Sequence, residues 1–443
     1  MNPIRFFLQG LRFDDLPKPV VEQAVRCLCD LAATAAAGSQ TRLSAIIHRH
    51  ARQQFAAPAE GPCARPLLGG TPVSASGAAL AGAMTIDAID AHDGHRLTKG
   101  HVGCALLPGL VAVLEAAGKT ISGPEFLALL TAGYEIGTRA GIALHATAPD
   151  YHTSGAWNAV NCAALCAHVL GADETQFEHA IGIAEYHGPR SQMMRGVDHP
   201  TMLKDGSGWG AMAGVSAGFL AMDGFTGAPA LTVCGPDVRK IWGDLGKTWL
   251  IMDQYFKPYP CCRWAHPGID AALSLTRRHH IDPDDIASID VYTFHEATRL
   301  NQGAPADTEQ AQYAAAFPIA AALVYGKVHA AQIDGPGLTD PAVLALCERI
   351  RLVQDDGYSA RFPAQRWAHV LLTLKNGDRL ESSPHTALGD PDNPISDSLL
   401  KAKYEALTHP VWGRAKAQRV MAAITALPEP ASTLAGFLDA IRS

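Results

Sequence analysis

The spacing of apolar residues predicts a long helix near the N-terminus. Between Leu16 and Gly38 the apolar positions recur every three or four residues, which is the repeat of one helix face: Val20, Val21, Ala24, Val25, Leu28 and Leu31. A proline near the start and a glycine at the end are typical helix boundaries. From Ala78 to about Gly224 the chain continues in long segments rich in Ala, Gly and Leu, such as GPEFLALLTAGYEIGTRAGIAL. Small residues let helices pack closely, so we predict a helical domain over residues 1–252.

The pattern changes after Pro258. The runs IASIDVYTF and WAHVLLTLKNGDRLES are alternating or β-branched, and Asn376-Gly377 within the second is a hairpin signal. Helical segments, AAAFPIAAALVYG and DPAVLALCERI, lie between them. We therefore predict a smaller α+β domain over residues 253–395. Helical periodicity returns in residues 396–443, which we expect to rejoin the first domain. The predicted fold class is mainly α, with a large all-helical domain and a smaller α+β lid.

Composition and charge narrow the class of protein. A chain of 443 residues is long for a single core, and 48% of its residues are hydrophobic. The formal net charge of −7 offers no basic field for a nucleic acid. Ten cysteines without zinc-type pairs are typical of small buried residues in a reducing compartment. The N-terminus lacks a signal-peptide core and no apolar run reaches membrane-spanning length, so we expect a cytoplasmic protein with no membrane partner.

The densest group of titratable residues lies in the stretch from Asp87 to Pro108, between two apolar segments. It contains three acids, three histidines and two cations: Asp87, Asp90, Asp93, His92, His95, His101, Arg96 and Lys99. Titratable groups between buried helices are costly unless they are paired or functional. We therefore interpret this stretch as part of a functional site.

Four other segments concentrate polar residues. HATAPDYHTSGAWNA contains His152, and a longer segment from Ala184 to Gly214 contains His187, Arg190, Arg195, Lys204 and Asp205. QYFKPYPCCRWAHPGIDA contains Lys257, Arg263 and His266, and QAQYAAAFPIAAAL is the fourth. Lys204 and Lys257 stand beside glycines, prolines and aromatics, unlike a typical solvated lysine. A pocket formed by Lys204, Lys257 and Arg263 would suit a substrate with several carboxylates, because charge-assisted bonds both bind and orient it.

Over nearly its whole length the chain resembles the MmgE/PrpD family, whose members include 2-methylcitrate dehydratase, cis-aconitate decarboxylase and iminodisuccinate epimerase. The resemblance is carried by ALAGAMTIDAIDAHD followed by His101, and by GYEIGTRAG, YHTSGAWNAVNCAA, MLKDGSGWGAMAGVSAGFLAMDGFTGAP, KPYPCCRWAHPGIDA and GDPDNPISDSLLKAKY. It implies a helical domain, an α+β lid, a site in the cleft between them, a homodimer and no cofactor.

By position, the resemblance implies five catalytic residues: Asp93, His101, His152, Lys204 and Lys257. We expect His101 to be the general acid/base with Asp93 as its partner, and Lys204, Lys257 and Arg263 to hold the carboxylates and the enediolate. His152 would orient the substrate or handle a second proton. Four further residues are candidates for substrate binding: His266, Arg190, Arg195 and His187.

The chain departs from the family pattern in two places. Val102 follows His101 where a proline is usual. The lid helix carries Ala314 and Phe317 where cis-aconitate decarboxylase-like members have a serine and a tyrosine. The missing tyrosine hydroxyl argues against decarboxylation of cis-aconitate.

The leading prediction is a cofactor-independent lyase of the dehydratase type, which moves a proton at the carbon α to a carboxylate in a small di- or tricarboxylate. The closest alternative is an epimerase or isomerase of an iminodisuccinate-type dicarboxylate. A metal-dependent hydrolase would use Asp93, His92, His95 and His101 as ligands, but their spacing matches no closed ligand set and we expect no metal. The fourth hypothesis is a non-catalytic homologue that only binds carboxylates. The sequence argues against it, because it contains all four of Asp93, His101, Lys204 and Lys257.

Overall fold

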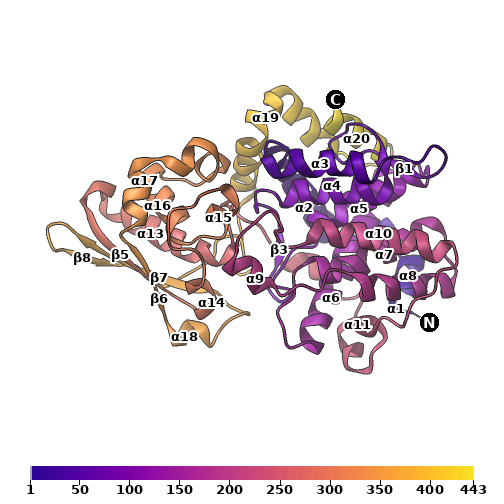
Figure 1. The fold of residues 1–443 in the computed structure, drawn as a ribbon, viewed down its shortest axis with the longest axis horizontal. Helices are drawn as coiled ribbons and strands as arrows, with labels where there is room; N and C mark the ends of the chain where they lie inside the picture. The colour runs from indigo at the N-terminus through magenta and orange to yellow at the C-terminus, as the bar shows by residue number, and fades with distance from the viewer. Residues whose placement is uncertain (1) are drawn as a thin grey trace.

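The protein is described by a computed structural model that covers residues 2–443, and most of it is a large helical domain (Figure 1). The predicted N-terminal helix is confirmed as α2, which spans Lys18–Gly38. The helices before the lid are α1 (Pro3–Gly10), α2, α3 (Arg42–Gln54), α4 (Ala75–Asp87), α5 (Gly103–Ala116), α6 (Gly123–Thr147), α7 (Gly155–Leu170), α8 (Glu174–His187), α9 (Met193–Asp198), α10 (Ser207–Met222), α11 (Leu231–Cys234) and α12 (Arg239–Trp242). A short ladder pairs β1 (Cys63–Ala64) with β2 (Val73–Ser74).

Small residues set the distance between the central helices. α10 packs against α7, α4 and α8, and α4 packs against α5. A Cβ atom on Gly210 or Gly214 of α10 would collide with the backbone of α7 at Gly155 or Ala159. The Ala/Gly-rich segments therefore form closely packed helices, as the sequence predicts.

The lid contains a five-stranded sheet in the order β6-β5-β7-β8, with β9 also paired to β7. β5 (Ile286–Thr293) runs parallel to β6 (Ile350–Gln354) and antiparallel to β7 (Trp367–Leu374), which in turn pairs with β8 (Arg379–Glu381) and β9 (His385–Thr386). The predicted hairpin at Asn376-Gly377 is confirmed between β7 and β8, where Gly377 has a φ of +95°. The lid helices are α13 (His266–His279), α14 (His295–Thr298), α15 (Thr308–Gln312), α16 (Ala316–Tyr325), α17 (Pro341–Cys347) and α18 (Asp356–Ser359).

Burial alternates along the lid strands because one face of the sheet packs against helices. Ile289, Val291, Val370 and Leu372 are buried, and α13 packs on β7 and β5. These residues belong to a second hydrophobic core that also takes in Met193 and Val197 of α9. The helical domain thus extends one short helix into the core of the lid.

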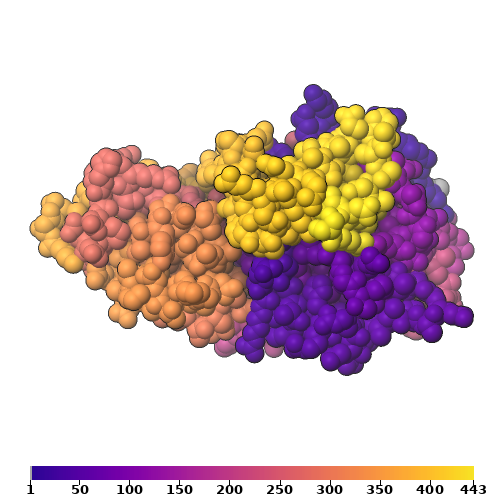
Figure 2. All heavy atoms as spheres, turned by 90° about the horizontal axis from the view of Figure 1, so that it is seen from above, coloured from indigo at the N-terminus to yellow at the C-terminus, as the bar shows by residue number. Residues whose placement is uncertain are grey.

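The C-terminal helices return to the helical domain. α19 (Asp397–Thr425) packs against α2, and α20 (Leu434–Arg442) packs against α19. Seen from above, these C-terminal helices lie over the N-terminal part of the chain, beside the lid (Figure 2). Lys403 of α19 is ion-paired with Asp30 of α2, and its Nζ donates a hydrogen bond of 2.5 Å to the carbonyl of Ala91. The C-terminal helix therefore supports the polar loop that follows α4.

The fold class predicted from the sequence, mainly α with a smaller α+β part, is confirmed. None of the helices in residues 2–443 combines the length and hydropathy that crossing a bilayer requires.

Candidate active site

The loop between α4 and α5 is tied to the beginning of the lid by a short antiparallel ladder. β3 (Gly94–His95) pairs with β4 (Gln254–Tyr255) in the register Gly94↔Tyr255 and His95↔Gln254. A Cβ on Gly94 would lie 2.5 Å from the Tyr255 hydroxyl and 2.7 Å from Nδ1 of His101, so only glycine allows this approach. The ladder brings Tyr255 and Lys257 of the lid against His101 and Asp90 of the helical domain.

A cavity lies at this junction. Its lining comes from both parts of the chain: Asp90, Lys99, His101, Tyr151, Met193, Val197 and Asp205 from the helical domain, and Tyr255, Lys257, Cys262, Arg263, Trp264, Tyr313 and Arg366 from the lid. Two of the five predicted catalytic residues, His101 and Lys257, are therefore part of the lining.

Lys257 and Asp90 form a buried ion pair inside the cavity. Nζ of Lys257 lies 2.6 Å from Oδ1 of Asp90 and donates a second hydrogen bond of 3.0 Å to the Asp90 carbonyl. Burial alone would raise the pKa of Asp90, but the ammonium groups of Lys257 and Lys204 outweigh it and hold that pKa well below its usual value. Asp90 is thus an ionised carboxylate, and Lys257 is an ammonium group fixed at the cavity wall.

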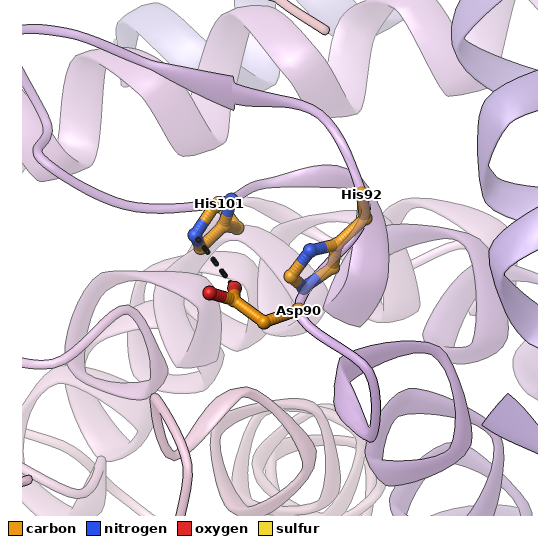
Figure 3. A group of neighbouring side chains, drawn as sticks. All are labelled: Asp90, His92 and His101. Atoms are coloured by element: carbon orange, nitrogen blue, oxygen red, sulfur yellow. Dashed lines mark ion pairs between the residues drawn. The ribbon is translucent and has the colours of Figure 1, made fainter. Parts of the chain in front are cut away.

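His101 presents one free ring nitrogen to the cavity. Nδ1 lies 2.5 Å from the main-chain carbonyl of Asp93, which can only accept, so Nδ1 carries the hydrogen. Nε2 is then unprotonated in the neutral ring and lies 3.8 Å from Oδ1 of Asp90 (Figure 3). Burial, and then the charges of His92 and Lys257, lower the pKa of His101 well below its usual value. The ring is therefore neutral at pH 7 and Nε2 can act as a base.

The expected contact between the Asp93 carboxylate and His101 is wrong. The Asp93 side chain is fully buried on the far side of the loop, where Oδ2 accepts a hydrogen bond from Tyr134 of α6. Burial raises the pKa of Asp93 to about 6, and Asp30 adds to this effect. Asp93 orients the imidazole through its main-chain carbonyl, and the carboxylate nearest to Nε2 belongs to Asp90, three residues earlier.

His92 stacks on His101 behind the cavity wall. The two rings are 4.3 Å apart at their centroids with an interplanar angle of 16°, and Nε2 of His92 lies 3.4 Å from Oδ1 of Asp87. Potential ligand atoms of Asp90, His92 and His101 lie within 4.8 Å of one another. However, lone pairs in two nearly parallel rings do not converge on one ion, and Asp90 already holds an ammonium group. This geometry suits proton transfer better than metal ligation.

Asp205 is a second acid in the cavity, with a different protonation state. Its carboxyl accepts a hydrogen bond of 3.0 Å from the Ser154 main-chain nitrogen and is bonded to the Ser154 hydroxyl. The same hydroxyl accepts from the main-chain nitrogen of His101 at 2.9 Å. Burial raises the pKa of Asp205 to about 8, and Asp87 adds to this shift. Two cavity acids with pKa values on opposite sides of neutrality are a common arrangement for acid/base chemistry.

Lys204 lies beside this cavity, not in its lining. Its Nζ is bonded to the amide oxygen of Gln312 and lies 5.2 Å from the ring centroid of Tyr313. It also lines a neighbouring cavity together with Arg195, His199 and Trp209. Lys204 therefore contacts the lid, and its charge helps to keep Asp90 ionised.

Backbone strain is concentrated around the site. Among residues 2–443, four non-glycine residues have a left-handed φ: Asp90 at 48°, Lys99 at 52°, Lys204 at 52° and His280 at 51°. The left-handed region costs an L-residue roughly 1–2 kcal/mol. Three of these four residues surround the cavity, and strain of this kind clusters at functional sites.

Arg263 and His266 have a structural role that the sequence does not reveal. The Arg263 guanidinium lines the cavity, but it is ion-paired with Asp390 at 2.8 Å and donates to the carbonyls of Ala387 and Leu388. It also donates to Nδ1 of His266 at 3.1 Å. Because these bonds take up both terminal nitrogens of the guanidinium and leave only Nε unbonded, Arg263 fixes the segment after β9 and is not a free carboxylate clamp.

The other predicted substrate-binding residues lie outside the cavity. His187 and Arg190 are exposed, and Arg195 is exposed at the neighbouring cavity. His152 is buried next to the cavity residue Tyr151, but its Nδ1 donates to the Asp150 carbonyl at 2.8 Å and its main-chain nitrogen to His145. His152 is not in the lining that the described residues form.

Sequence reasoning assigned no site role to several lining residues, among them Asp90, Lys99, Asp205, Tyr255, Tyr313 and Arg366. Asp90 stood in the correct cluster, but three acids at short spacing gave no sign of which one faces the cavity. Tyr313 directly precedes Ala314, and its ring lines the cavity, whereas Phe317 is fully buried in the lid core. A phenol hydroxyl is therefore present in the cavity although Phe317 has none.

Comparison with known proteins gives relatives along almost the whole chain. The chain is 25% identical to the cis-aconitate decarboxylase-like protein oryM of Aspergillus oryzae (strain ATCC 42149 / RIB 40), over 94% of this chain and 92% of the relative. It is 24% identical to the cis-aconitate decarboxylase of Aspergillus terreus, over 95% and 91% of the two chains. Models of the MmgE/PrpD N-terminal domain and of the MmgE/PrpD C-terminal domain match residues 4–235 and 259–428. Both halves that enclose the cavity are thus matched, and the chain belongs to the MmgE/PrpD family.

Proposed function

We propose that this protein is a cofactor-independent lyase of the dehydratase type, acting on a small di- or tricarboxylate by proton transfer at the carbon α to a carboxylate. The observation that carries this proposal is the position of the unprotonated Nε2 of His101 beside the buried pair of Asp90 and Lys257. A neutral base next to a fixed ammonium group is what removal of a weakly acidic α-hydrogen requires.

The charge of the cavity supports an anionic substrate. Four cations line it, namely Lys99, Lys257, Arg263 and Arg366, against the acids Asp90 and Asp205. Asp205, with a pKa of about 8, carries a proton at pH 7 and adds little negative charge. Carboxylates entering this cavity would meet an excess of positive charge in a buried environment, where charge-assisted hydrogen bonds are strong.

The proposed reaction has two proton transfers. Nε2 of His101 removes the α-proton, and the electron pair of that C–H bond passes into the adjacent carboxylate to give an enediolate, which the Lys257 ammonium stabilises. The pair then forms the C=C bond as the C–O bond at carbon β breaks. The carboxyl of Asp205 supplies the proton with which the hydroxyl leaves as water. His101 ends protonated and Asp205 ionised, and exchange with solvent restores both.

The relatives support the same class of substrate. The two compared proteins bear names of cis-aconitate decarboxylases, and cis-aconitate is a tricarboxylate. At about 25% identity the relatives leave open which bond is broken after the substrate is bound. Tyr313 supplies the cavity with a hydroxyl, so we include cis-aconitate among the substrates to test.

An epimerase of a dicarboxylate is the second candidate. It needs two acid/base groups that reach one carbon from opposite sides. The observation that favours it is the presence of two such groups, His101 and Asp205, in the same lining. In this reaction Asp205 would return a proton to carbon α and no water would be lost.

The test is proton NMR in deuterated water with purified protein and a panel of di- and tricarboxylates that includes cis-aconitate and 2-methylcitrate. Deuterium at carbon α with formation of an alkene indicates dehydration, deuterium without loss of a group indicates epimerisation, and loss of one carboxylate indicates decarboxylation. His101→Asn should lower the exchange rate by at least about 100-fold. His187→Asn, the same substitution at an exposed position, is the control. Exchange at the wild-type rate in His101→Asn would refute the assignment of the base.

A further inference from the structure

Arg366 is a buried cation without an acidic partner. Its side chain is 1% exposed, and it lies directly before β7. Nη2 makes a hydrogen bond of 3.4 Å to the carbonyl of Arg96, whereas Nε and Nη1 have no hydrogen-bond partner among residues 2–443. An unpaired charge of this kind is costly to bury. Two guanidinium nitrogens are therefore free to bind a group that is not part of the described chain.

The other buried cations of the described chain have partners. Lys257, Arg263, Arg139 and Lys403 are each ion-paired with an acid, and Lys204 is bonded to the Gln312 amide. The Asp390 carboxylate interacts with Arg366 only through longer-range electrostatics. Its Oδ1 accepts a hydrogen bond from Arg263. Within this group Arg366 is the cation that has two unbonded nitrogens and no acid within ion-pair distance, whereas Arg139 and Arg263 are ion-paired and leave only Nε unbonded.

These donors belong to a residue of the cavity lining. The Arg366 guanidinium carbon lies 5.7 Å from the ring centroid of Tyr255, and the His101 ring centroid lies 6.3 Å from the same centroid. Arg366 and the catalytic base therefore flank one aromatic ring. Lys99, which also lines the cavity, is held in a left-handed conformation with its ammonium 4.4 Å from the Tyr151 ring centroid.

We infer that Arg366, assisted by Lys99, binds a second carboxylate of the substrate, remote from the carbon at which His101 acts. A guanidinium group offers paired N–H donors that match the two oxygens of a carboxylate. In this arrangement Lys257 would hold the carboxylate next to the reacting carbon, and Arg366, which lies over the Tyr255 ring, would hold the other one. The substrate must then carry at least two carboxylates. This inference rests on the proposed function for the role of His101, but the binding site itself does not.

The experiment measures binding, so that it does not depend on turnover. Tricarballylate, a saturated tricarboxylate that cannot lose water, is titrated calorimetrically into the wild type and into Arg366→Gln, Arg366→Lys and Arg361→Gln. Arg361 is an exposed arginine of the same segment and serves as the matched control. Loss of charged hydrogen bonds should weaken tricarballylate binding about 10- to 100-fold in Arg366→Gln, less in Arg366→Lys, and not in Arg361→Gln. The ratio of the affinity for tricarballylate to the affinity for butyrate should fall by a similar factor in Arg366→Gln.

A second measurement separates a binding role from a structural role. Because Arg366 is unpaired in the folded chain, Arg366→Gln without ligand should melt at the same temperature as the wild type or higher. A lowered melting temperature combined with unchanged tricarballylate affinity would overturn the inference, as would a wild type that binds no polycarboxylate. If His101→Asn exchanges normally while Arg366→Gln loses affinity, the proposed base is wrong and the carboxylate site stands.

Discussion

Lys257 and Asp90 are joined by a buried ion pair of 2.6 Å between Nζ and Oδ1, although one belongs to the first segment of the lid and the other to the loop after α4. Both residues line the cavity, and Oδ1 of Asp90 lies 3.8 Å from Nε2 of His101. The same ion pair therefore joins the lid to the helical domain and contributes to the charge near His101.

Removing one partner of this pair should destabilise the protein more than removing both. Lys257→Met leaves an uncompensated buried carboxylate, which should cost about 3–5 kcal/mol in the free energy of unfolding. The double variant Lys257→Met/Asp90→Asn carries no unpaired charge and should be more stable than Lys257→Met. Urea unfolding of the two single variants and the double variant measures the coupling. If the losses in free energy of unfolding in the two single variants add up to the loss in the double variant, the two side chains do not interact in solution.

Activity should survive removal of divalent metals. Asp90, His92 and His101 are close enough to suggest a metal site, but the ammonium of Lys257 and the stacking of the two rings oppose ligation. We expect the rate of α-proton exchange to be unchanged after dialysis against EDTA. Stoichiometric bound metal, together with activity that is lost on chelation and restored by the metal, would contradict this.

Local sequence patterns predicted the parts of the fold that depend on local physics. The helix Lys18–Gly38 follows from its apolar repeat, and the turn at Asn376-Gly377 from the need for a positive φ. Both were correct because neither needs information about distant residues. His101 and Lys257 were found because charged groups stood among apolar or aromatic neighbours and because the segments resembled a known family.

Residues whose role depends on long-range contacts could not be assigned from the sequence. Asp90, whose φ is left-handed, pairs with Lys257 at the cavity, whereas the Asp93 side chain is bonded to Tyr134, and the spacing of the two acids does not reveal this difference. Arg263 is of a residue type that often binds carboxylates, but its guanidinium donates hydrogen bonds to main-chain carbonyls of the segment after β9. Arg366 lies in a polar stretch that resembles an exposed turn, and only the folded lid brings it to the cavity.

The homodimer that the family resemblance implies remains a prediction. Of the eleven exposed large hydrophobic side chains among residues 2–443, five lie between residues 203 and 231, in and around α10: Leu203, Trp209, Leu220, Phe225 and Leu231. Exposed apolar groups gathered in one region favour self-association. Light scattering should give twice the monomer mass of 46.9 kDa. Trp209→Glu with Leu220→Glu should shift the protein toward monomer, whereas Tyr325→Glu, on an exposed part of the lid, should not. A wild type that is monomeric at micromolar concentration would refute the prediction.

The protonation of Asp205 should be visible in the pH dependence of stability. The pKa of Asp205 is raised to about 8 in the folded protein, whereas an aspartate in an unfolded chain has a pKa of about 3.9. Between these values the folded state keeps a proton that the unfolded state releases. Ionisation therefore opposes folding, and the contribution of Asp205 to stability falls as the pH rises from about 4 to about 8, by at most about 1.4 kcal/mol per pH unit.

Asp205→Asn removes this titration while keeping an amide oxygen that can accept the hydrogen bond from the Ser154 main-chain nitrogen. Relative to the wild type, the variant should therefore gain stability as the pH rises from 5 to 8, measured as the difference in free energy of unfolding. Asp223→Asn, the same change at an exposed position beyond the other end of α10, should follow the wild-type curve. If Asp205 is also the acid that releases water, Asp205→Asn should lose at least about 100-fold in the dehydration rate while still exchanging the α-proton through His101. Parallel stability curves for Asp205→Asn and the wild type between pH 5 and 8 would show that the carboxyl is already ionised, which would remove Asp205 from the role of proton donor.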